Sequence, residues 1–170
     1  MLRISLLLLA SLGIASAQIK VAIINVQNAV LETAEIKKAQ TDLEAKYRPQ
    51  QAELEKLQKE IVDLQGQLQA GQGKLTQQAE QDIQITGARK QRELKRRSED
   101  LQAEVDRERN EVLQRSGGRM QEVVKKLAEE KALDVVIDVT NAVYFKPALE
   151  ITKEAIAAYD KAYPSAAAAK

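Results

Sequence analysis

The sequence predicts an α+β protein in which a small β body carries a long helical arm. Strand-like segments lie near the two ends of the chain, at residues 20–26 and 135–145. The stretch between them, residues 36–131, is rich in helix-forming side chains and has an apolar pattern typical of coiled coils. Aromatic residues make up only 3% of the 170-residue chain. Because large buried aromatics usually supply much of a core, one compact globule is not expected over this length.

The first 17 residues have the pattern of a cleavable export signal. Arg3 precedes an apolar run over residues 4–12, and the Ala-Ser-Ala sequence at 15–17 fits the small-residue rule for cleavage after Ala17. The apolar run is shorter than the roughly 20 residues that cross a bilayer, so cleavage is favoured over an uncleaved anchor. The chain contains no cysteine, so it needs no oxidative folding, which suits a bacterial periplasm as well as any other exported compartment.

The composition argues against an enzyme. Histidine and cysteine are both absent, which removes thiol nucleophiles, Cys/His zinc sites and histidine acid–base pairs. Carboxylates remain, but nearly all of them lie in repetitive charged helix. We therefore expect no catalysis, no cofactor and no metal site. Cleavage would remove Arg3, one of 26 basic residues, and the remaining 25 would balance the 25 acidic residues, so the mature chain is formally neutral.

The first half of the arm has the spacing of a heptad seam. Its apolar residues follow one another at intervals of three or four, with one position skipped, a narrow stripe that suits a single partner helix. Pro49 removes a backbone donor and crowds the preceding turn, so we expect a bend or a break there. The glycines within residues 70–76 predict a turn at the tip of the arm. The stripe consists of Leu43, Tyr47, Leu54, Leu57, Ile61, Leu64 and Leu68.

The second half of the arm, residues 77–131, keeps the heptad register with fewer apolar residues. Two such tracts around one glycine turn predict an antiparallel helical hairpin whose seam is incompletely packed. Gly117 and Gly118 cost a helix about 1 kcal/mol each and lie where the hairpin rejoins the body, so we interpret them as a hinge or kink. Plain tolerance of glycine in an exposed helix is the alternative interpretation.

The sequence period changes again after the arm, where residues 133–145 are largely β-branched and apolar. Thr140-Asn141 divides this segment with a weak turn signal. We therefore expect a β-hairpin formed by residues 135–139 and 142–145, with residues 20–26 joining its edge. This arrangement would give the opening strand its partner on the far side of the arm.

A final helix is predicted over residues 149–163, where its apolar side chains would cover one face of the sheet. Three short strands and one helix make a marginal body with open strand edges, and we expect oligomerisation, with strands from several chains, to complete it. The expected divisions are the signal at 1–17, the first strand and connector at 18–35, the arm at 36–131, and the β-hairpin with the C-terminal helix at 132–170.

The strand motifs and their order around the helical excursion carry a family resemblance. The opening IKVAIINVQNAVLET, the charged hairpin, and LDVVIDVTNAVYF before a final helix resemble the OmpH/Skp family of periplasmic chaperones over residues 18–163. The resemblance implies a homotrimer whose strands form one β body and whose three arms enclose unfolded outer-membrane proteins. It implies no ATP, no catalysis and no cofactor. Members of this family are often strongly basic, which suits acidic clients and lipopolysaccharide, so the neutrality of this chain is a departure.

One strongly basic segment remains in this chain of balanced charge. Residues 89–97, RKQRELKRR, hold six basic side chains and one acidic side chain, a net charge of +5. As a solvated helix face, the segment would form salt bridges with acidic residues of the other half of the arm. As a contact site, it would bind acidic clients, lipopolysaccharide or the phosphates of a membrane surface. These candidate contact residues, called the basic run below, are Arg89, Lys90, Arg92, Lys95, Arg96 and Arg97.

A structural role is the main alternative to client capture. An exported coiled-coil spacer or adaptor of the cell envelope would use its heptads for assembly, yet such a protein has no need for strands at both ends of its coil. Nucleic-acid binding through the basic run is not expected, because the mature chain is neutral, carries an export signal and lacks stacking aromatics.

Overall fold

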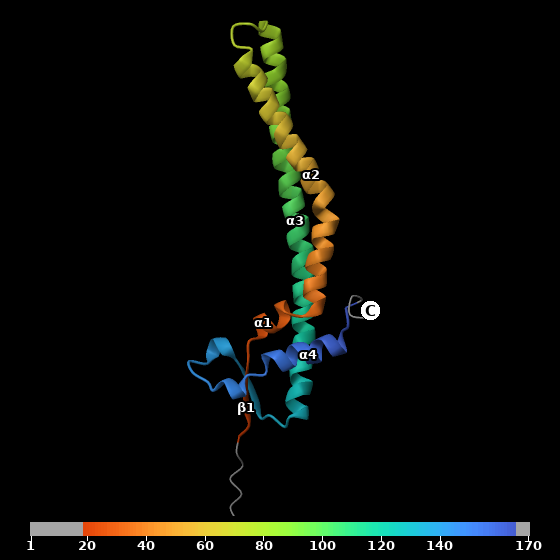
Figure 1. Cartoon of the computed structure of the whole chain (residues 1–170), viewed down its shortest axis with the longest axis vertical. Coiled ribbons are helices and arrows are strands. Elements are labelled where there is room, and N and C mark those ends of the chain that lie inside the picture. Colours follow the sequence, from red (N-terminus) through yellow and green to blue (C-terminus); the bar gives the residue numbers. More distant parts are fainter. Residues whose placement is uncertain (1–18, 166–170) are drawn as a thin grey trace, which may run out of the picture.

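A computed structural model describes residues 19–165, which form a small body and a two-helix arm that extends from it (Figure 1). The expected export signal, with its cleavage point after Ala17, lies outside the described residues. Among the described helices, none combines the length and the apolar character that crossing a membrane requires. The elements in chain order are β1 (Val21–Ile24), α1 (Val26–Leu31), α2 (Ala34–Ala70), α3 (Gln77–Glu130), β2 (Val135–Asp138), η1 (Val139–Asn141), η2 (Pro147–Leu149) and α4 (Thr152–Ala162).

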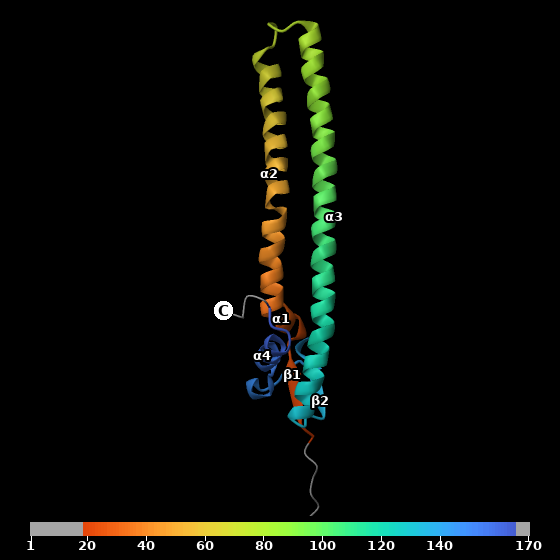
Figure 2. The ribbon, with the colours of Figure 1, turned by 90° about the vertical axis from the view of Figure 1, so that its right-hand side faces the viewer.

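The arm is an antiparallel pair of long helices, as the heptad spacing predicts. Helices α2 and α3 run side by side and are joined by a turn at the tip (Figure 2). Thr33 and Thr76 cap the two helix N-termini, accepting hydrogen bonds from Ile36 N at 3.4 Å and Ala79 N at 3.2 Å. At the tip, Gly73 has a φ of +72°, a left-handed conformation that glycine adopts without strain.

Both arm helices pass without interruption through the residues that predict a distortion. Helix α2 continues through Pro49, so the expectation of a break is wrong, and Figure 1 shows the upper part of α2 leaning across α3. Tyr47 and Leu57 are buried against α3 on either side of the proline, and this packing holds the helix together despite one missing hydrogen bond. Helix α3 is likewise continuous across Gly117 and Gly118, whose role as a hinge stays a prediction.

The sheet differs from the expected one. Strands β1 and β2 pair in parallel, starting with Val21 opposite Val135. Residues 139–141 form the 3-10 turn η1, and residues 142–145 are not a strand, so the expected β-hairpin of residues 135–139 with residues 142–145 is wrong. Parallel strands require a long connection between them, and here α1 and the whole arm supply it.

Asp138 provides the physical reason for this difference. Its carboxylate accepts hydrogen bonds from Thr140 N at 2.9 Å and Thr140 Oγ1 at 2.6 Å, which turn the chain into η1 directly after β2. The same carboxylate accepts a hydrogen bond from Val26 N at 3.1 Å, which ties the end of β2 to the start of α1. The other edge of β1 is met by the segment before α4, where Ile151 N donates to Ile23 O at 2.9 Å.

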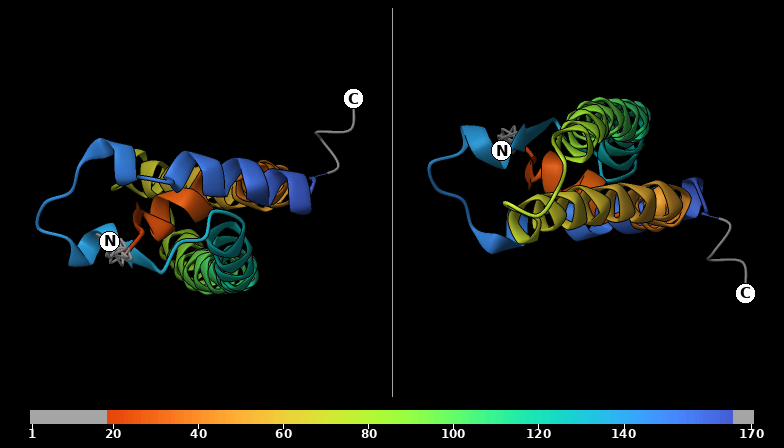
Figure 3. Two further views of the ribbon diagram at one scale, coloured as in Figure 1. Left: turned by 90° about the horizontal axis from the view of Figure 1, so that it is seen from below. Right: turned by 90° about the horizontal axis from the view of Figure 1, so that it is seen from above.

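The core lies where α1, the root half of α3 and α4 meet β1. Helix α4 begins at Thr152, later than the predicted residue 149, because the chain first forms the short turn η2. Viewed along the arm in Figure 3, the segment between β2 and α4 projects away from both arm helices. The buried core residues are Ala22, Ile24, Ala29, Val30, Ile36, Met120, Val123, Leu127, Ile151, Ala155 and Tyr159.

Candidate functional site

The basic run lies in the tip half of α3, where two of its members reach across the seam to acidic residues of α2. Lys90 Nζ lies 2.7 Å from Glu60 Oε2, and Arg97 Nη1 lies 3.3 Å from Glu53 Oε2. The hydrogen bond from Lys90 holds the pKa of the Glu60 carboxyl below its ordinary value. Arg97 also pairs with Glu93 on its own helix at 2.5 Å. These contacts are the ones that the solvated-face interpretation expects.

The other four members of the basic run are exposed and weakly held. Lys95 and Arg96 pair only with acidic residues one turn further along α3, at 3.9 Å and 3.5 Å. Within residues 19–165, Arg89 and Arg92 have no acidic partner within 4.0 Å. Arg89 and Arg92 are therefore the members whose charge is available to a ligand, and the contact-site interpretation stays a prediction.

The seam of the arm is more deeply buried on α2 than on α3. On α2, Tyr47, Leu57 and Ile61 are buried, which confirms the predicted stripe. On α3, by contrast, every residue from 77 to 115 is exposed or only half-buried. Val62 and Ile85 point apolar surface at solvent, with more than half of their area exposed. The tip half of the arm thus offers scattered apolar side chains among many charges.

An apolar groove lies between α2 and α3 in the root half of the arm. Its volume is about 280 Å³. The Tyr47 hydroxyl at this groove is buried and has no hydrogen-bond partner among the described residues. A groove with such a lining suits apolar side chains of a bound segment. Its apolar lining consists of Leu31, Ile36, Leu43, Val105, Val112 and Leu113.

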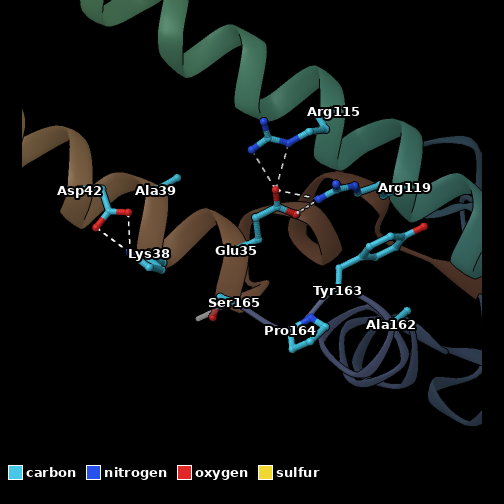
Figure 4. A pocket seen from close by; sticks show the side chains of 10 residues that line it. All are labelled: Glu35, Lys38, Ala39, Asp42, Arg115, Arg119, Ala162, Tyr163, Pro164 and Ser165. Atoms are coloured by element: carbon cyan, nitrogen blue, oxygen red, sulfur yellow. Dashed lines mark hydrogen bonds and ion pairs between the residues drawn. The ribbon is translucent and has the colours of Figure 1, made fainter. Parts of the chain in front are cut away.

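Charged and phenolic side chains from three helices meet at the root of the arm (Figure 4). Glu35, in the first turn of α2, has a side chain that is only 15% exposed. Its Oε1 accepts hydrogen bonds from Arg115 Nε at 3.1 Å and Arg115 Nη2 at 3.0 Å, and Arg119 Nη1 lies 2.9 Å from Oε2. From α4, the Tyr159 hydroxyl donates to Oε2 at 2.5 Å. One carboxylate therefore joins α2, α3 and α4.

The electrostatics of this cluster favour the ionised form of Glu35. Burial by itself would raise the pKa of the Glu35 carboxyl, but hydrogen bonds from Tyr159, Arg115 and Arg119 outweigh it, and the pKa lies below its ordinary value of 4.5. Burial and the hydrogen bond to Glu35 raise the pKa of the Tyr159 hydroxyl. At neutral pH the cluster therefore holds a carboxylate, two guanidinium groups and a neutral phenol.

Further contacts fasten α4 to both arm helices. Asp160 Oδ1 accepts a hydrogen bond from Ala34 N, the first residue of α2, at 2.9 Å. The Arg119 guanidinium lies 4.6 Å from the centre of the Tyr163 ring, and the Tyr163 hydroxyl donates to Glu122 Oε2 at 3.0 Å. An open cavity of about 470 Å³ adjoins this cluster. We call the cluster the root clasp, and it consists of Glu35, Arg115, Arg119, Tyr159, Asp160 and Tyr163.

The root clasp is not predicted by the sequence. Tyr159 lies in the predicted final helix, whose apolar side chains are expected only to cover the sheet, and the charges of Glu35, Arg115 and Arg119 resemble those of any solvated arm residue. One signal was available, because Arg115 and Arg119 are four residues apart and thus share one face of a helix. Their common partner is 80 and 84 residues away in the sequence, and no local pattern identifies it.

The body exposes apolar side chains near its strand edges. Val143 is fully exposed, Tyr144 is 82% exposed, and Leu149 and Val135 are 37% and 44% exposed. Three of these four lie in or beside the segment that projects from the body in Figure 3. Exposed apolar residues gathered on one segment are typical of an interface.

No group of three or more His, Cys, Asp or Glu side chains within residues 19–165 is arranged to hold a metal ion. The chemistry that the described residues offer is ion pairing and apolar contact. The fold and these surfaces together define a class of protein in which a small α/β body carries one long, loosely packed helical hairpin.

Comparisons with known proteins identify the family within this class. The model of the family described as "Outer membrane protein (OmpH-like)" matches residues 20–159, so the chain belongs to the OmpH-like family, and the predicted resemblance is confirmed. A Skp-like protein of Pseudomonas aeruginosa is 26% identical over 142 residues, which cover 84% of each chain. The crystal structure of an OmpH-like protein of Caulobacter crescentus CB15 has the same fold, with a TM-score of 0.71, 21% identity and 88% of each chain covered.

Proposed function

We propose that this protein is an ATP-independent periplasmic holdase chaperone that encloses unfolded outer-membrane proteins and prevents their aggregation. The observation that carries the proposal is the arm, in which α3 has no buried residue from 77 to 115 and Val62 and Ile85 expose apolar surface among many charges. Membership of the OmpH-like family supports it, and the Caulobacter protein is described as a candidate outer-membrane chaperone. Export by a signal that is cleaved after Ala17 is part of the proposal.

The proposed capture depends on many weak contacts. An unfolded outer-membrane protein has strands in which apolar residues alternate with polar ones, and these strands aggregate when they are exposed together. A chaperone without ATP lowers the concentration of such segments only by binding them. Apolar residues spread over several arms raise the effective concentration of contact without any strong single site. Local contacts of this kind also let the client leave.

A homotrimer is part of the same proposal, because one arm alone encloses nothing. The exposed residues Val143, Tyr144 and Leu149 support it, as does the outer edge of β2, which no described strand covers. A two-stranded sheet is marginal by itself, and neighbouring copies would cover its edges and these side chains. The division of the chain into a body, 18–35 with 132–170, and an arm, 36–131, belongs to this proposal.

Size-exclusion chromatography with light scattering tests the function. The mature chain, Gln18 to Lys170, would be run alone and with a urea-unfolded outer-membrane β-barrel protein diluted into buffer. We expect a trimer that keeps the client in one soluble peak. A trimer that leaves the client to precipitate would contradict the chaperone function and leave the exported spacer or adaptor as the better description.

The basic run is proposed as a secondary contact for acidic clients, lipopolysaccharide or a membrane surface. The open charges of Arg89 and Arg92 support this part of the proposal. The ion pairs of Lys90 and Arg97 argue that these two residues contribute more to the arm itself.

A further inference from the structure

The root clasp surrounds the residues of α3 that offer the least resistance to bending. Gly117 and Gly118 lie between Arg115 and Arg119, so the two arginines that bind Glu35 flank the glycine pair. A Cβ atom at either glycine would meet no neighbouring atom within 4 Å, which means that the face of the helix that carries the glycine pair is open, although Ser116 and Met120 on the opposite side are buried. Glycine also permits backbone conformations that other residues avoid.

The arm has few other attachments to the body. Away from its root, α2 lies beside α3 alone, as Figure 1 and Figure 2 both show. At the root, its first residues are held from α4 by two contacts, the hydrogen bond of Ala34 N to Asp160 and that of Tyr159 to Glu35. Helix α3 continues from the arm into the core, where Met120, Val123 and Leu127 are buried. The direction of the arm relative to the body is therefore fixed by contacts within a few helical turns at the root of α2 and α3.

The contacts of the clasp hold both sides of the glycine pair. Arg115 lies on the arm side of the glycines and Arg119 on the body side, and both bind the same carboxylate. Bending of α3 at the glycines changes the distance between the two guanidinium groups, and it therefore breaks at least one of these hydrogen bonds. Hydrogen bonds to a charged group contribute more than neutral ones, especially when the group is mostly withdrawn from water.

We propose that the Glu35-centred root clasp locks the direction of the arm, and that its release lets the arm swing about Gly117 and Gly118. Helix α4 is the part of the body that closes the lock, through Tyr159, Asp160 and Tyr163. The clasp residues are positioning residues, and they contact no client. The inference concerns the isolated chain and does not depend on the proposed function. If the function holds, the same swing adjusts the space between arms to the size of a client.

A distance measurement between the arm tip and the body tests the lock. The chain has no cysteine, so Q72C at the exposed tip and K153C at the exposed start of α4 give two unique spin-label sites. The 37-residue α2 places these sites on the order of 55 Å apart, within the range of pulsed electron double resonance. Labelled chain would be mixed with an excess of unlabelled chain, so that distances between copies do not contribute. No client is added.

We expect a narrow distance distribution for the otherwise unchanged chain and a broad one for E35Q and Y159F. E35Q removes the charge, and Y159F removes a single hydrogen bond from the same carboxylate. The matched control is E108Q, which breaks the ion pair of Lys46 with Glu108 within the arm and leaves the clasp intact. Circular dichroism would show that each variant keeps its helical content.

Substitution of the glycine pair provides a second, independent test. G117A with G118A fits without a steric clash and stiffens α3, so it should narrow the broad distribution of E35Q. Folded E35Q and Y159F with the narrow distribution of the unchanged chain would overturn the lock. A broad distribution in E35Q that the two alanines do not narrow would overturn the glycine pivot.

Discussion

Asp138 at the end of β2 accepts a hydrogen bond at 3.1 Å from the backbone N–H of Val26, which lies 112 residues earlier in the chain. The same carboxylate accepts two hydrogen bonds from Thr140. One side chain thus closes the end of the parallel strand pair, begins the turn after β2 and holds the start of α1. The two ends of a sequence separated by the whole arm are joined at this residue.

The first prediction follows from this position of Asp138. Replacing it by alanine leaves Val26 N and Thr140 N without their acceptor, and we expect the free energy of unfolding of the chain to fall by about 1–2 kcal/mol. Urea unfolding followed by circular dichroism measures the change. The control is D63A, because Asp63 is an exposed residue of α2 far from the body. Equal midpoints for D138A and D63A would show that the junction does not depend on this carboxylate.

The lowered pKa of Glu35 predicts an acid-sensitive contribution to stability. A carboxyl whose pKa is lower in the folded than in the unfolded chain stabilises the fold above its unfolded value, here 4.5, and this contribution is lost as the pH falls through the folded pKa. Between pH 5 and pH 8 the unchanged chain should therefore be more stable than E35Q by a constant amount. Arg115, Arg119 and Tyr159 face the carboxyl. The pKa values of two of them are raised further above this range, that of Arg119 by its hydrogen bond to Glu35 and that of Tyr159 by burial and its hydrogen bond to Glu35.

Urea midpoints of the unchanged chain and E35Q, measured at several values from pH 7 down to pH 3, check this expectation. The two midpoints should approach one another below pH 4.5. Asp138 also has a lowered pKa, because of its hydrogen bonds from Thr140, but it contributes equally to both proteins and cancels in the difference. A difference that is independent of pH down to pH 3 would mean that the charge of Glu35 is not what stabilises the root.

The fold could be predicted from the sequence where the pattern is local and repetitive. The heptad spacing around Tyr47, Leu57 and Ile61 predicted the arm, and the β-branched segments predicted where strands lie. The direction of strand pairing could not be predicted in the same way. Alternation of apolar residues is the same for parallel and antiparallel neighbours, and the decision rests on Asp138, whose hydrogen bonds to Thr140 make a 3-10 turn out of the expected hairpin turn.

The tip of the arm gives a paired glycine prediction. Gly73 has a φ of +72°, so G73A forces alanine into a left-handed conformation that costs about 1 kcal/mol or more. Gly66 lies within α2, and a Cβ there would meet nothing within 4 Å, so G66A should instead raise the melting temperature of the arm. Thermal melts recorded by circular dichroism measure both. Opposite shifts are expected, and shifts of the same sign would contradict the described tip geometry.

The proposed homotrimer predicts that one exposed apolar residue of the body is covered by another copy. Val143 is fully exposed in the single chain, and a charge at this position would be costly inside an interface. V143D should therefore shift the light-scattering mass toward that of a monomer. The control is V62D, which places the same charge at an exposed apolar position on the arm. A trimeric V143D would place the interface elsewhere on the body.

For the candidate sites, as for the fold, local patterns could be predicted from the sequence and contacts between distant segments could not. The basic run could be found from the sequence because its six basic residues fall within nine positions, whereas its ion pairs could not, since Glu60 and Glu53 face it only after the hairpin forms. The root clasp depends on α4 docking against the start of α2. Its central hydrogen bond joins Tyr159 to Glu35 across 124 residues, a separation over which sequence spacing carries no information.

The last prediction distinguishes the two interpretations of the basic run. R89Q with R92Q removes two charges that have no acidic partner among the described residues, whereas K95Q with R96Q removes two charges from weak pairs on the same helix. The two double variants have the same net charge, so long-range attraction to an acidic client is changed equally. If the open charges contact the client, R89Q with R92Q should weaken client binding several-fold more than K95Q with R96Q. It should also reduce the salt dependence of binding more strongly, because direct charge contacts are screened by salt.

Fluorescence titration of a labelled, urea-unfolded β-barrel protein at two salt concentrations measures both effects, and the triple variant R92Q, R96Q and R97Q should bind weakly as well. Equal affinities for the two double variants would favour the solvated-face interpretation, in which the segment serves the solubility and pairing of the arm.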